Sequence, residues 1–325
     1  MTVAVVNTSS LKKYPDLIEK LKSVSEIDYV TVDKDISPME LSKRLEDAEY
    51  IITGITPTYT REFFENAKNL KFLVRQGIGY NNVDVVAAKE FNVEVGNVPG
   101  FVEKEDVAEH AVALLMALAK KSIISSQSVL NGEWSVKRDR FFGTRLNKKK
   151  IGILGFGNVG KTFARMMKYG FECEIYAYDP YISEELIHEW GAEKKDLDEV
   201  LSLCDVISLH INLTDDNYHL INEEKLKLMK PGAFLINTAR GELVDEKAIV
   251  ESLKNNTLGG YGCDVIENEP IKMDNVLLTS PNVIITPHTA VYNKECNFKM
   301  CESTVNDVIN VSFGNEPINS LTKRI

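Results

Sequence analysis

The sequence predicts an α/β protein that contains two parallel sheets. Its 325 residues suit about two domains of roughly 100–200 residues each. Short apolar runs alternate with amphipathic stretches, which is the pattern of successive βαβ units. The alternation stops at a long apolar stretch near residue 103 and restarts near residue 150, so we expect one sheet before this break and one after it.

The first hundred residues are expected to form five strands with helices between them. The expected strands are Val3–Val6, Ile27–Val32, Tyr50–Thr53, Phe72–Arg75 and Val93–Val95. The expected helices lie near Leu11–Leu21, Pro38–Leu45, Arg61–Ala67 and Val83–Glu90. This alternation predicts that the first sheet is parallel.

A single long helix is expected from Glu103 to Ser125. Apolar residues recur in it at helical spacing, at Val107, Ala111, Leu114, Leu115 and Leu118. A last helix is expected from about Cys296 to Phe313.

Six further strands are expected after Lys150. They are Ile151–Leu154, Ile175–Tyr178, Val206–Leu209, Phe234–Asn237, Gly260–Asp264 and Val283–Thr286. Several are nearly continuous apolar runs, as in parallel strands that helices cover on both faces.

Composition and charge exclude several classes of protein. Hydrophobic residues make up 44% and charged residues 26%, which argues against disorder and fibrous repeats. The net charge of −10 disfavours nucleic-acid and membrane-surface partners. The first residues lack a signal-peptide pattern, and the most apolar run, Ala111–Ala119, is too short to cross a bilayer. Five cysteines without metal-ligand spacing predict free thiols, a cytoplasmic location and no bound metal.

The motif Gly155-Phe156-Gly157-Asn158-Val159-Gly160 follows an expected strand and opens an expected helix. Gly155 permits a tight turn, Gly157 lets the backbone approach a pyrophosphate, and Gly160 lets the helix pack close to the strand. The helix N-terminus offers free N–H groups to phosphates. We therefore expect a Rossmann-type dinucleotide site.

Asp179 ends the next expected strand, 24 residues after Gly155. A carboxylate at this offset binds the adenosine ribose hydroxyls and repels a 2′-phosphate. No Arg or Lys stands in Pro180–Ser183 to neutralise such a phosphate, which favours NAD over NADP. The alternatives are a plain glycine turn with a helix-capping Asp179, or a site for S-adenosylmethionine on a related fold.

Three polar residues follow expected strands of the second sheet. Arg240 stands in Asn237–Gly241, Glu269 in Asp264–Pro270, and His288 in Thr286–Ala290. Ligands of open α/β sheets bind beyond the carboxyl ends of the strands, so all three side chains are expected to face one crevice. Taken alone, His288 would be interpreted as a loop or capping histidine, and Arg240 and Glu269 as surface charges.

With these motifs the chain resembles the D-2-hydroxyacid dehydrogenase family along almost its whole length. The resemblance also includes Gly77–Asp84, Asn97–Gly100, Val107-Ala108-Glu109-His110, Leu209–Thr214 and Met229–Gly232. The stretch Thr286–Tyr292 is most similar to the D-lactate dehydrogenase branch.

The resemblance implies a role for each polar residue. His288 is the expected proton donor to the substrate carbonyl, and Glu269 orients its ring and favours its cation. Arg240 is expected to bind the keto oxygen and the carboxylate with its planar fork. The implied cofactor contacts are Gly155, Gly157, Asn158, Val159, Gly160, Asp179, His210, Thr214, Ala239 and Asp264. The implied substrate contacts are Ile78, Gly79, Phe101, Arg240 and Tyr292.

The resemblance also implies the domain organisation. A substrate domain is expected from residues 1–101 and 292–325, with an NAD-binding domain, residues 102–291, inserted into it. The long helix of residues 103–125 resembles the element on which family members dimerise, and its extensive apolar face favours a homodimer. Phe101 stands near a tyrosine position of D-lactate dehydrogenases, and losing that hydroxyl would allow a bulkier substrate side chain.

The expected activity is the reversible reduction of a small 2-oxo acid to a D-2-hydroxy acid with NADH, on a pyruvate-like or somewhat larger aliphatic substrate. The same fold also serves dehydrogenases of 3-phosphoglycerate and of hydroxypyruvate or glyoxylate, which stay open as alternatives. A non-enzymatic NAD-sensing protein, similar to the corepressors that share this fold, is the alternative from another class. The sequence leaves the preferred acid and the reaction direction open.

Overall fold

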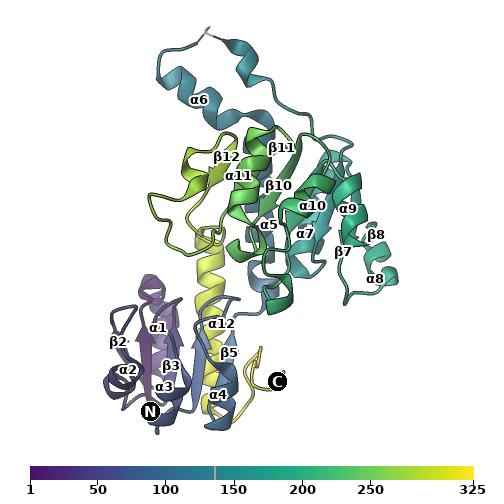
Figure 1. Cartoon of the computed structure of the whole chain (residues 1–325). Helices are drawn as coiled ribbons and strands as arrows, with labels where there is room; N and C mark the ends of the chain where they lie inside the picture. Colours follow the sequence, from purple (N-terminus) through teal and green to yellow (C-terminus); the bar gives the residue numbers. More distant parts are fainter. Residues whose placement is uncertain (135–136) are drawn as a thin grey trace. The chain divides into compact units, whose positions relative to one another are not determined.

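The computed structural model describes residues 1–134 and 137–325 (Figure 1). The chain forms two compact units. Unit 1 contains Met1–Glu103 and Val291–Ile325, and unit 2 contains Lys104–Ala290. Each unit has one parallel sheet, so the expected α/β class with two parallel sheets is confirmed.

Unit 1 has a five-stranded sheet in the order β2-β1-β3-β4-β5. Its strands are β1 (Thr2–Val6), β2 (Glu26–Val30), β3 (Tyr50–Thr53), β4 (Phe72–Arg75) and β5 (Glu94–Asn97). All neighbouring strands are parallel. This is the flavodoxin-like order, in which the chain reverses its direction of travel across the sheet between β1 and β3.

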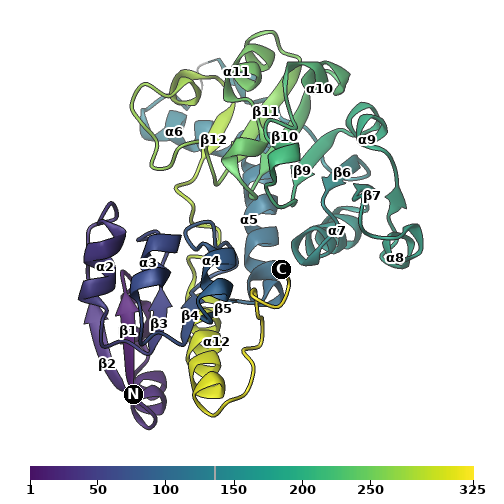
Figure 2. The ribbon, with the colours of Figure 1, turned by 60° about the horizontal axis from the view of Figure 1, so that its bottom comes forward.

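Helices cover both faces of the unit 1 sheet. On one face α1 (Pro15–Lys22) packs with α12 (Lys294–Ser312), through Leu17 and Leu21 of α1 and Cys301 and Val305 of α12. Figure 2 shows α12 alongside β4 and β5, although it comes from the far end of the sequence. The other face is covered by α2 (Pro38–Arg44), α3 (Arg61–Asn66) and α4 (Val85–Glu90).

Unit 2 has a seven-stranded parallel sheet in the order β12-β11-β10-β9-β6-β7-β8. Its strands are β6 (Lys150–Leu154), β7 (Glu174–Tyr178), β8 (Glu193–Lys194), β9 (Val206–Leu209), β10 (Ala233–Asn237), β11 (Leu258–Cys263) and β12 (Val283–Ile285). This is the Rossmann order with one strand added. The strand order reverses between β6 and β9, where such sheets bind ligands.

Two layers of helices bury the unit 2 sheet. One layer contains α5 (Gly100–Lys120), α7 (Asn158–Phe171) and α8 (Glu184–Glu189). The other contains α9 (Leu197–Leu203), α10 (Glu223–Leu228) and α11 (Glu246–Lys254). Single 3₁₀ turns lie at Ser10–Lys13, Arg138–Phe141, Asp215–Asn217, Gly241–Leu243 and Val276–Thr279.

The expected single helix of residues 103–125 is wrong. The first helix, α5, begins at Gly100 and ends at Lys120, and α6 (Ser122–Leu130) follows it. Lys121 lies between them with a φ of 52°, a left-handed conformation that interrupts the helical hydrogen bonds. The apolar face of α5 is buried in the core of unit 2 by the same chain, at Ala111, Leu114, Leu115 and Leu118.

The sequence does not predict the short strand β8. Strand β2, Glu26–Val30, begins one residue earlier and ends two residues earlier than the predicted Ile27–Val32. Within the two described ranges, the chain has no helix with the length and apolar character needed to cross a membrane.

Candidate active site

The glycine loop of unit 2 begins where β6 ends. Gly155 has a φ of +92°, and a Cβ on it would lie 2.5 Å from the carbonyl oxygen of His210, just after β9. A Cβ on Gly160 would lie 2.1 Å from the carbonyl oxygen of Gly155. Both positions therefore require glycine, and the loop sits at the point where the strand order reverses.

Gly157 differs from its two neighbours because nothing lies within 4 Å of the Cβ it lacks. It caps α7, whose first intrahelical bond runs from the N–H of Lys161 to the carbonyl of Gly157 at 3.0 Å. The N–H groups of Asn158, Val159 and Gly160 therefore have no acceptor within the helix. Open space above a helix N-terminus is what a pyrophosphate requires.

Asp179 ties the glycine loop to the segment after β7. Its carboxylate accepts hydrogen bonds from the N–H groups of Phe156 at 2.8 Å, Tyr181 at 2.9 Å and Ile182 at 3.2 Å. A carboxylate has about four acceptor sites, so one stays available for a ribose hydroxyl. The residues present therefore fit the NAD that the motif predicts.

His210 lies beside this loop as a neutral group. Burial lowers the pKa of its imidazole to about 3. Its Nε2 lies 2.9 Å from Ser208 Oγ, and its ring packs at 5.2 Å from that of Phe163 in α7. A charge next to the dinucleotide loop is thus avoided at neutral pH.

His288 and Glu269 form the pair that the sequence predicted. His288 Nδ1 lies 2.8 Å from Glu269 Oε2, and the two side chains are 45% and 36% exposed. An ionised carboxylate only accepts hydrogen bonds, so Nδ1 carries the hydrogen. Nε2 on the opposite side of the ring is thereby left to exchange a proton.

Asp264 holds the loop that carries His288. Its carboxylate accepts the hydroxyl of Thr286 at 2.6 Å and the N–H groups of Thr289 and Ala290, each at 2.8 Å. Burial alone would raise the pKa of Asp264, but hydrogen bonds from His110, Thr286 and these N–H groups lower it below its usual range. Oδ2 accepts one of these bonds and keeps room for another, so its predicted contact with nicotinamide stays a prediction.

Arg240 follows β10, and its loop packs directly on the loop of Glu269. A Cβ on the adjacent Gly241 would lie 1.9 Å from the carbonyl carbon of Ile266. The N–H of Ile266 in turn donates to Glu269 Oε1 at 3.3 Å. The Arg240 guanidinium donates to the carbonyl of Ala239 at 2.6 Å.

The remaining predicted residues fall into two groups. Ala239 and Thr214 lie in loops after β10 and β9 of unit 2, where the side chains of Asn237 and Asn217 accept their N–H groups at 3.0 and 2.8 Å. The predicted substrate contacts of unit 1 are Ile78, Gly79, Phe101 and Tyr292, of which Phe101 is 56% and Tyr292 76% exposed. Their part in binding stays a prediction.

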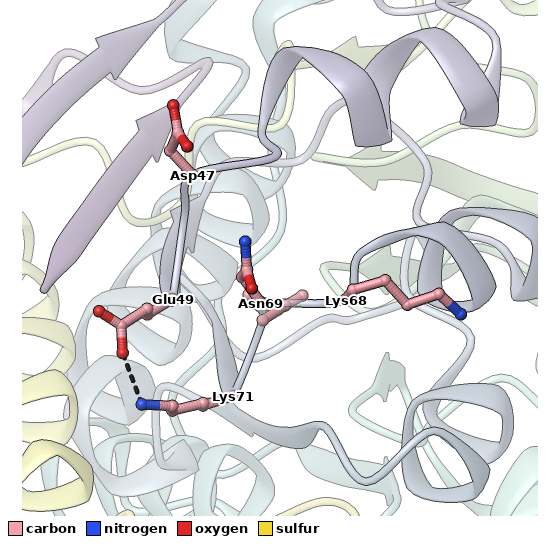
Figure 3. A pocket seen from close by; sticks show the side chains of 6 residues that line it. Asp47, Glu49, Lys68, Asn69 and Lys71 are labelled. Carbon is pink, nitrogen blue, oxygen red and sulfur yellow. Dashed lines mark hydrogen bonds and ion pairs between the residues drawn. The ribbon is translucent and has the colours of Figure 1, made fainter.

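A cavity in unit 1 is lined by none of the predicted site residues. It has a volume of about 380 Å³ and lies where β3 and β4 begin, the edge opposite their carboxyl ends (Figure 3). Lys71 Nζ and Glu49 Oε2 pair across it at 2.5 Å, which neutralises both charges. Among the described residues, no group of three or more His, Cys, Asp or Glu side chains could hold a metal ion.

Comparison with known proteins gives a consistent result. A family model described as D-isomer specific 2-hydroxyacid dehydrogenase, NAD binding domain, matches residues 112–290. A glyoxylate reductase of Korarchaeum cryptofilum is 34% identical, over 95% of this chain and 93% of that protein. A D-3-phosphoglycerate dehydrogenase of Methanocaldococcus jannaschii is 37% identical, over 87% of this chain and 52% of that protein.

Comparison with solved structures indicates the same family. The apo-structure of D-lactate dehydrogenase from Escherichia coli has a TM-score of 0.85 and 33% identity, and the match covers 99% of this chain and 100% of that one. The Rossmann sheet, its glycine loop and the match to an NAD-binding family define an oxidoreductase that uses NAD. The chain belongs to the D-isomer specific 2-hydroxyacid dehydrogenase family.

Proposed function

We propose that this dehydrogenase reduces a small 2-oxo acid, pyruvate-like or somewhat larger, to a D-2-hydroxy acid, and that the reaction is reversible. The observation that carries the proposal is the His288–Glu269 pair, whose Nδ1–Oε2 hydrogen bond of 2.8 Å leaves Nε2 for the substrate. The names of its relatives, glyoxylate reductase and D-lactate dehydrogenase, support the same substrate class.

His288 performs the proton transfer in this proposal. In the reductive direction the imidazolium donates the Nε2 hydrogen to the carbonyl oxygen and becomes the neutral ring. The Nδ1 hydrogen stays on the ring and is donated to Glu269 throughout, so a single ring orientation serves both protonation states. When bound, NADH supplies the hydride.

Arg240 binds the anionic substrate. The net charge of the chain is −10, so an anion requires a local cation. The guanidinium fork pairs with a carboxylate in two parallel hydrogen bonds, which a lysine cannot reproduce. The close contact between Gly241 and Ile266 holds the loop of Arg240 against the loop of Glu269. The anion-binding Arg240 and the glutamate that orients the proton donor therefore lie on two loops that pack together.

The test follows NADH absorbance with pyruvate, 2-oxobutyrate, branched 2-oxo acids, glyoxylate and hydroxypyruvate, with NADPH in parallel. We expect turnover of at least one acid and a preference for NADH, because the carboxylate of Asp179 would repel a 2′-phosphate. If NADH is oxidised with none of these acids, the proposal is wrong.

A second candidate substrate is 3-phosphoglycerate. The relative from Methanocaldococcus jannaschii carries that name, and this chain spans about half of its length. Oxidation of 3-phosphoglycerate with NAD, at a kcat/KM above that of the D-2-hydroxy acid formed from each 2-oxo acid of the panel, would favour this candidate over the first.

We further propose that the protein is a homodimer, although the predicted reason for it changes. The apolar face of α5 is buried by its own unit, whereas α6 exposes Ile124 at 46%, Val129 at 49% and Leu130 at 83%. Light scattering should give twice the mass of one chain, and Leu130→Glu should lower it. Phe313→Glu, at another exposed apolar residue, is the control. A monomer in the unmodified protein would overturn the proposal.

A cytoplasmic location is proposed from the cysteines. All five are buried and none forms a disulfide, as expected for thiols kept in a reducing compartment. Cell fractionation followed by detection of the protein tests this location, and recovery of the protein outside the cytoplasm would contradict it.

A further inference from the structure

His110 lies on α5 and reaches the loop that carries His288. Its Nε2 is 2.8 Å from Thr286 Oγ1 and 3.4 Å from Asp264 Oδ1, and the side chain is 21% exposed. The contact joins residues 176 positions apart in the sequence.

The hydrogen positions in this cluster follow from the chemistry of its members. Asp264 is 2% exposed, and because its pKa is lowered its carboxylate is ionised and only accepts. Thr286 has one hydroxyl hydrogen, and its acceptors are Asp264 Oδ1 at 2.6 Å and the carbonyl oxygen of Cys263 at 3.5 Å. The shorter, charged contact takes the hydrogen. Thr286 Oγ1 must therefore accept from His110, so His110 Nε2 carries a hydrogen.

Asp264 forms hydrogen bonds with His288 itself and with residues before and after it in the chain. The hydroxyl of Thr286 and the N–H groups of Thr289 and Ala290 all donate to the Asp264 carboxylate. The N–H of His288 donates to the carbonyl oxygen of Asp264 at 2.8 Å. His288 itself has a φ of 54°, a left-handed conformation that a non-glycine residue keeps only when its surroundings impose it.

We propose that His110 is a positioning residue, which orients His288 through Thr286 and Asp264. By donating to Thr286 Oγ1, His110 leaves the threonine hydroxyl only one orientation, toward Asp264. Asp264 then holds the backbone around His288, so that the imidazole meets Glu269 in one geometry. The kinetic part of this proposal rests on the proposed reduction of a 2-oxo acid.

Four variants test the chain of contacts. His110→Phe keeps a ring but removes the donor, and Thr286→Val removes the hydroxyl from a side chain of similar shape. Each is expected to lower kcat by up to about 10²-fold, because a small misplacement of a catalytic group costs that much. His110→Gln and Thr286→Ser keep a donor and a hydroxyl, so each should recover part of the loss.

The dissociation constant of NADH separates positioning from general damage. We expect it to change much less than kcat in all four variants, because Asp264 is the one implied cofactor contact in the cluster and the glycine loop lies outside it. The double variant of His110→Phe and Thr286→Val should lose about as much as the more damaging of the two single variants, since both substitutions act through Asp264. His188→Phe, on the exposed side of α8, is the matched control and should keep full kcat.

Nuclear magnetic resonance of the five histidines makes the test independent of turnover. Signals of His288 are identified by their loss in His288→Ala. In His110→Phe they should shift, whereas those of His188 should not. Unmoved His288 signals, or an unchanged kcat in His110→Phe, would overturn the proposal. Inactivity of the unmodified enzyme on every 2-oxo acid would instead refute the proposed function, and the His288 signals would still decide the role of His110.

Discussion

Two histidine–glutamate pairs take their glutamates from the same loop of unit 2, which follows β11, and the geometries of the two pairs differ. His288 pairs with Glu269 through Nδ1 at 2.8 Å, with side chains 45% and 36% exposed. His219 pairs with Glu267 through Nε2 at 3.3 Å, with side chains 29% and 25% exposed. The two glutamates are only two residues apart, so local sequence alone does not separate the pairs.

The second pair is part of a structural cluster. Tyr218 donates its hydroxyl to Glu267 Oε1 at 2.6 Å, and the Tyr218 and His219 rings stack at 4.0 Å. The N–H of Glu267 donates to Glu246 Oε1 at 2.9 Å. The ring nitrogen farther from the backbone, Nε2, contacts the carboxylate in this pair, whereas in His288 the carboxylate contacts Nδ1. Nε2 of His288 is therefore the nitrogen to which our proposal assigns the proton transfer.

Removing each imidazole should give the largest contrast. His288→Ala should lower kcat about 10²–10⁴-fold, the usual contribution of a positioned acid or base, with the NADH dissociation constant unchanged. His219→Ala should leave kcat nearly unchanged. Steady-state kinetics and NADH titration measure both quantities. Equal losses of kcat in the two variants would remove the distinction between the pairs.

Replacing each glutamate by glutamine should give a smaller contrast. Glu269→Gln weakens the support of the His288 cation, so kcat should fall by about tenfold to hundredfold, less than on removal of the imidazole. Glu267→Gln should keep kcat but lower the midpoint of thermal unfolding by a few degrees, because two donors lose their charged acceptor. A normal midpoint with reduced kcat in Glu267→Gln would place the second pair in the reaction.

The smallest effect concerns the titration of Tyr218. Its hydrogen bond to Glu267, followed by desolvation and nearby carboxylates, raises the pKa of Tyr218 above the usual value of about 10. The folded state therefore keeps this proton at a pH where the unfolded chain loses it. The stabilisation is present below the unfolded pKa and is lost as pH rises through the folded one.

Ultraviolet absorbance of tyrosinate, taken as the difference between the unmodified protein and Tyr218→Phe, measures that titration. In Glu267→Gln the titration of Tyr218 should move to lower pH. A titration that does not move would show that Glu267 does not hold the tyrosine hydroxyl in solution.

The strands could be predicted from the sequence where burial on both faces leaves a continuous apolar run. Tyr50–Thr53, Phe72–Arg75 and Val206–Leu209 have the bounds that the pattern predicts. Strand β8 has only Glu193 and Lys194, so no such pattern marks it. The break at Lys121 was missed because Ile123 and Ile124 continue the apolar pattern beyond it.

In the candidate site, too, some features could be predicted from the sequence and others could not. Gly155, Gly160 and Asp179 could be predicted because one loop and the next strand bring them together over a short stretch of chain. The contact between His110 and Thr286 could not, because its members come from a helix and a loop at distant points of the sequence. The motif around His110 was noted, but only the fold shows what its side chain contacts.

Unit 1 is built from both ends of the chain, and this sets the order in which the two units can fold during synthesis. Unit 2 is a continuous segment and is complete once Ala290 has left the ribosome. Unit 1 starts first but needs α12 and Leu321, which fill the two faces of its sheet. The second unit is therefore finished before the first, since chains emerge from the N-terminus. A nascent chain that stalls before α12 carries a folded nucleotide-binding unit beside a sheet with one face partly bare, which is a substrate for chaperones.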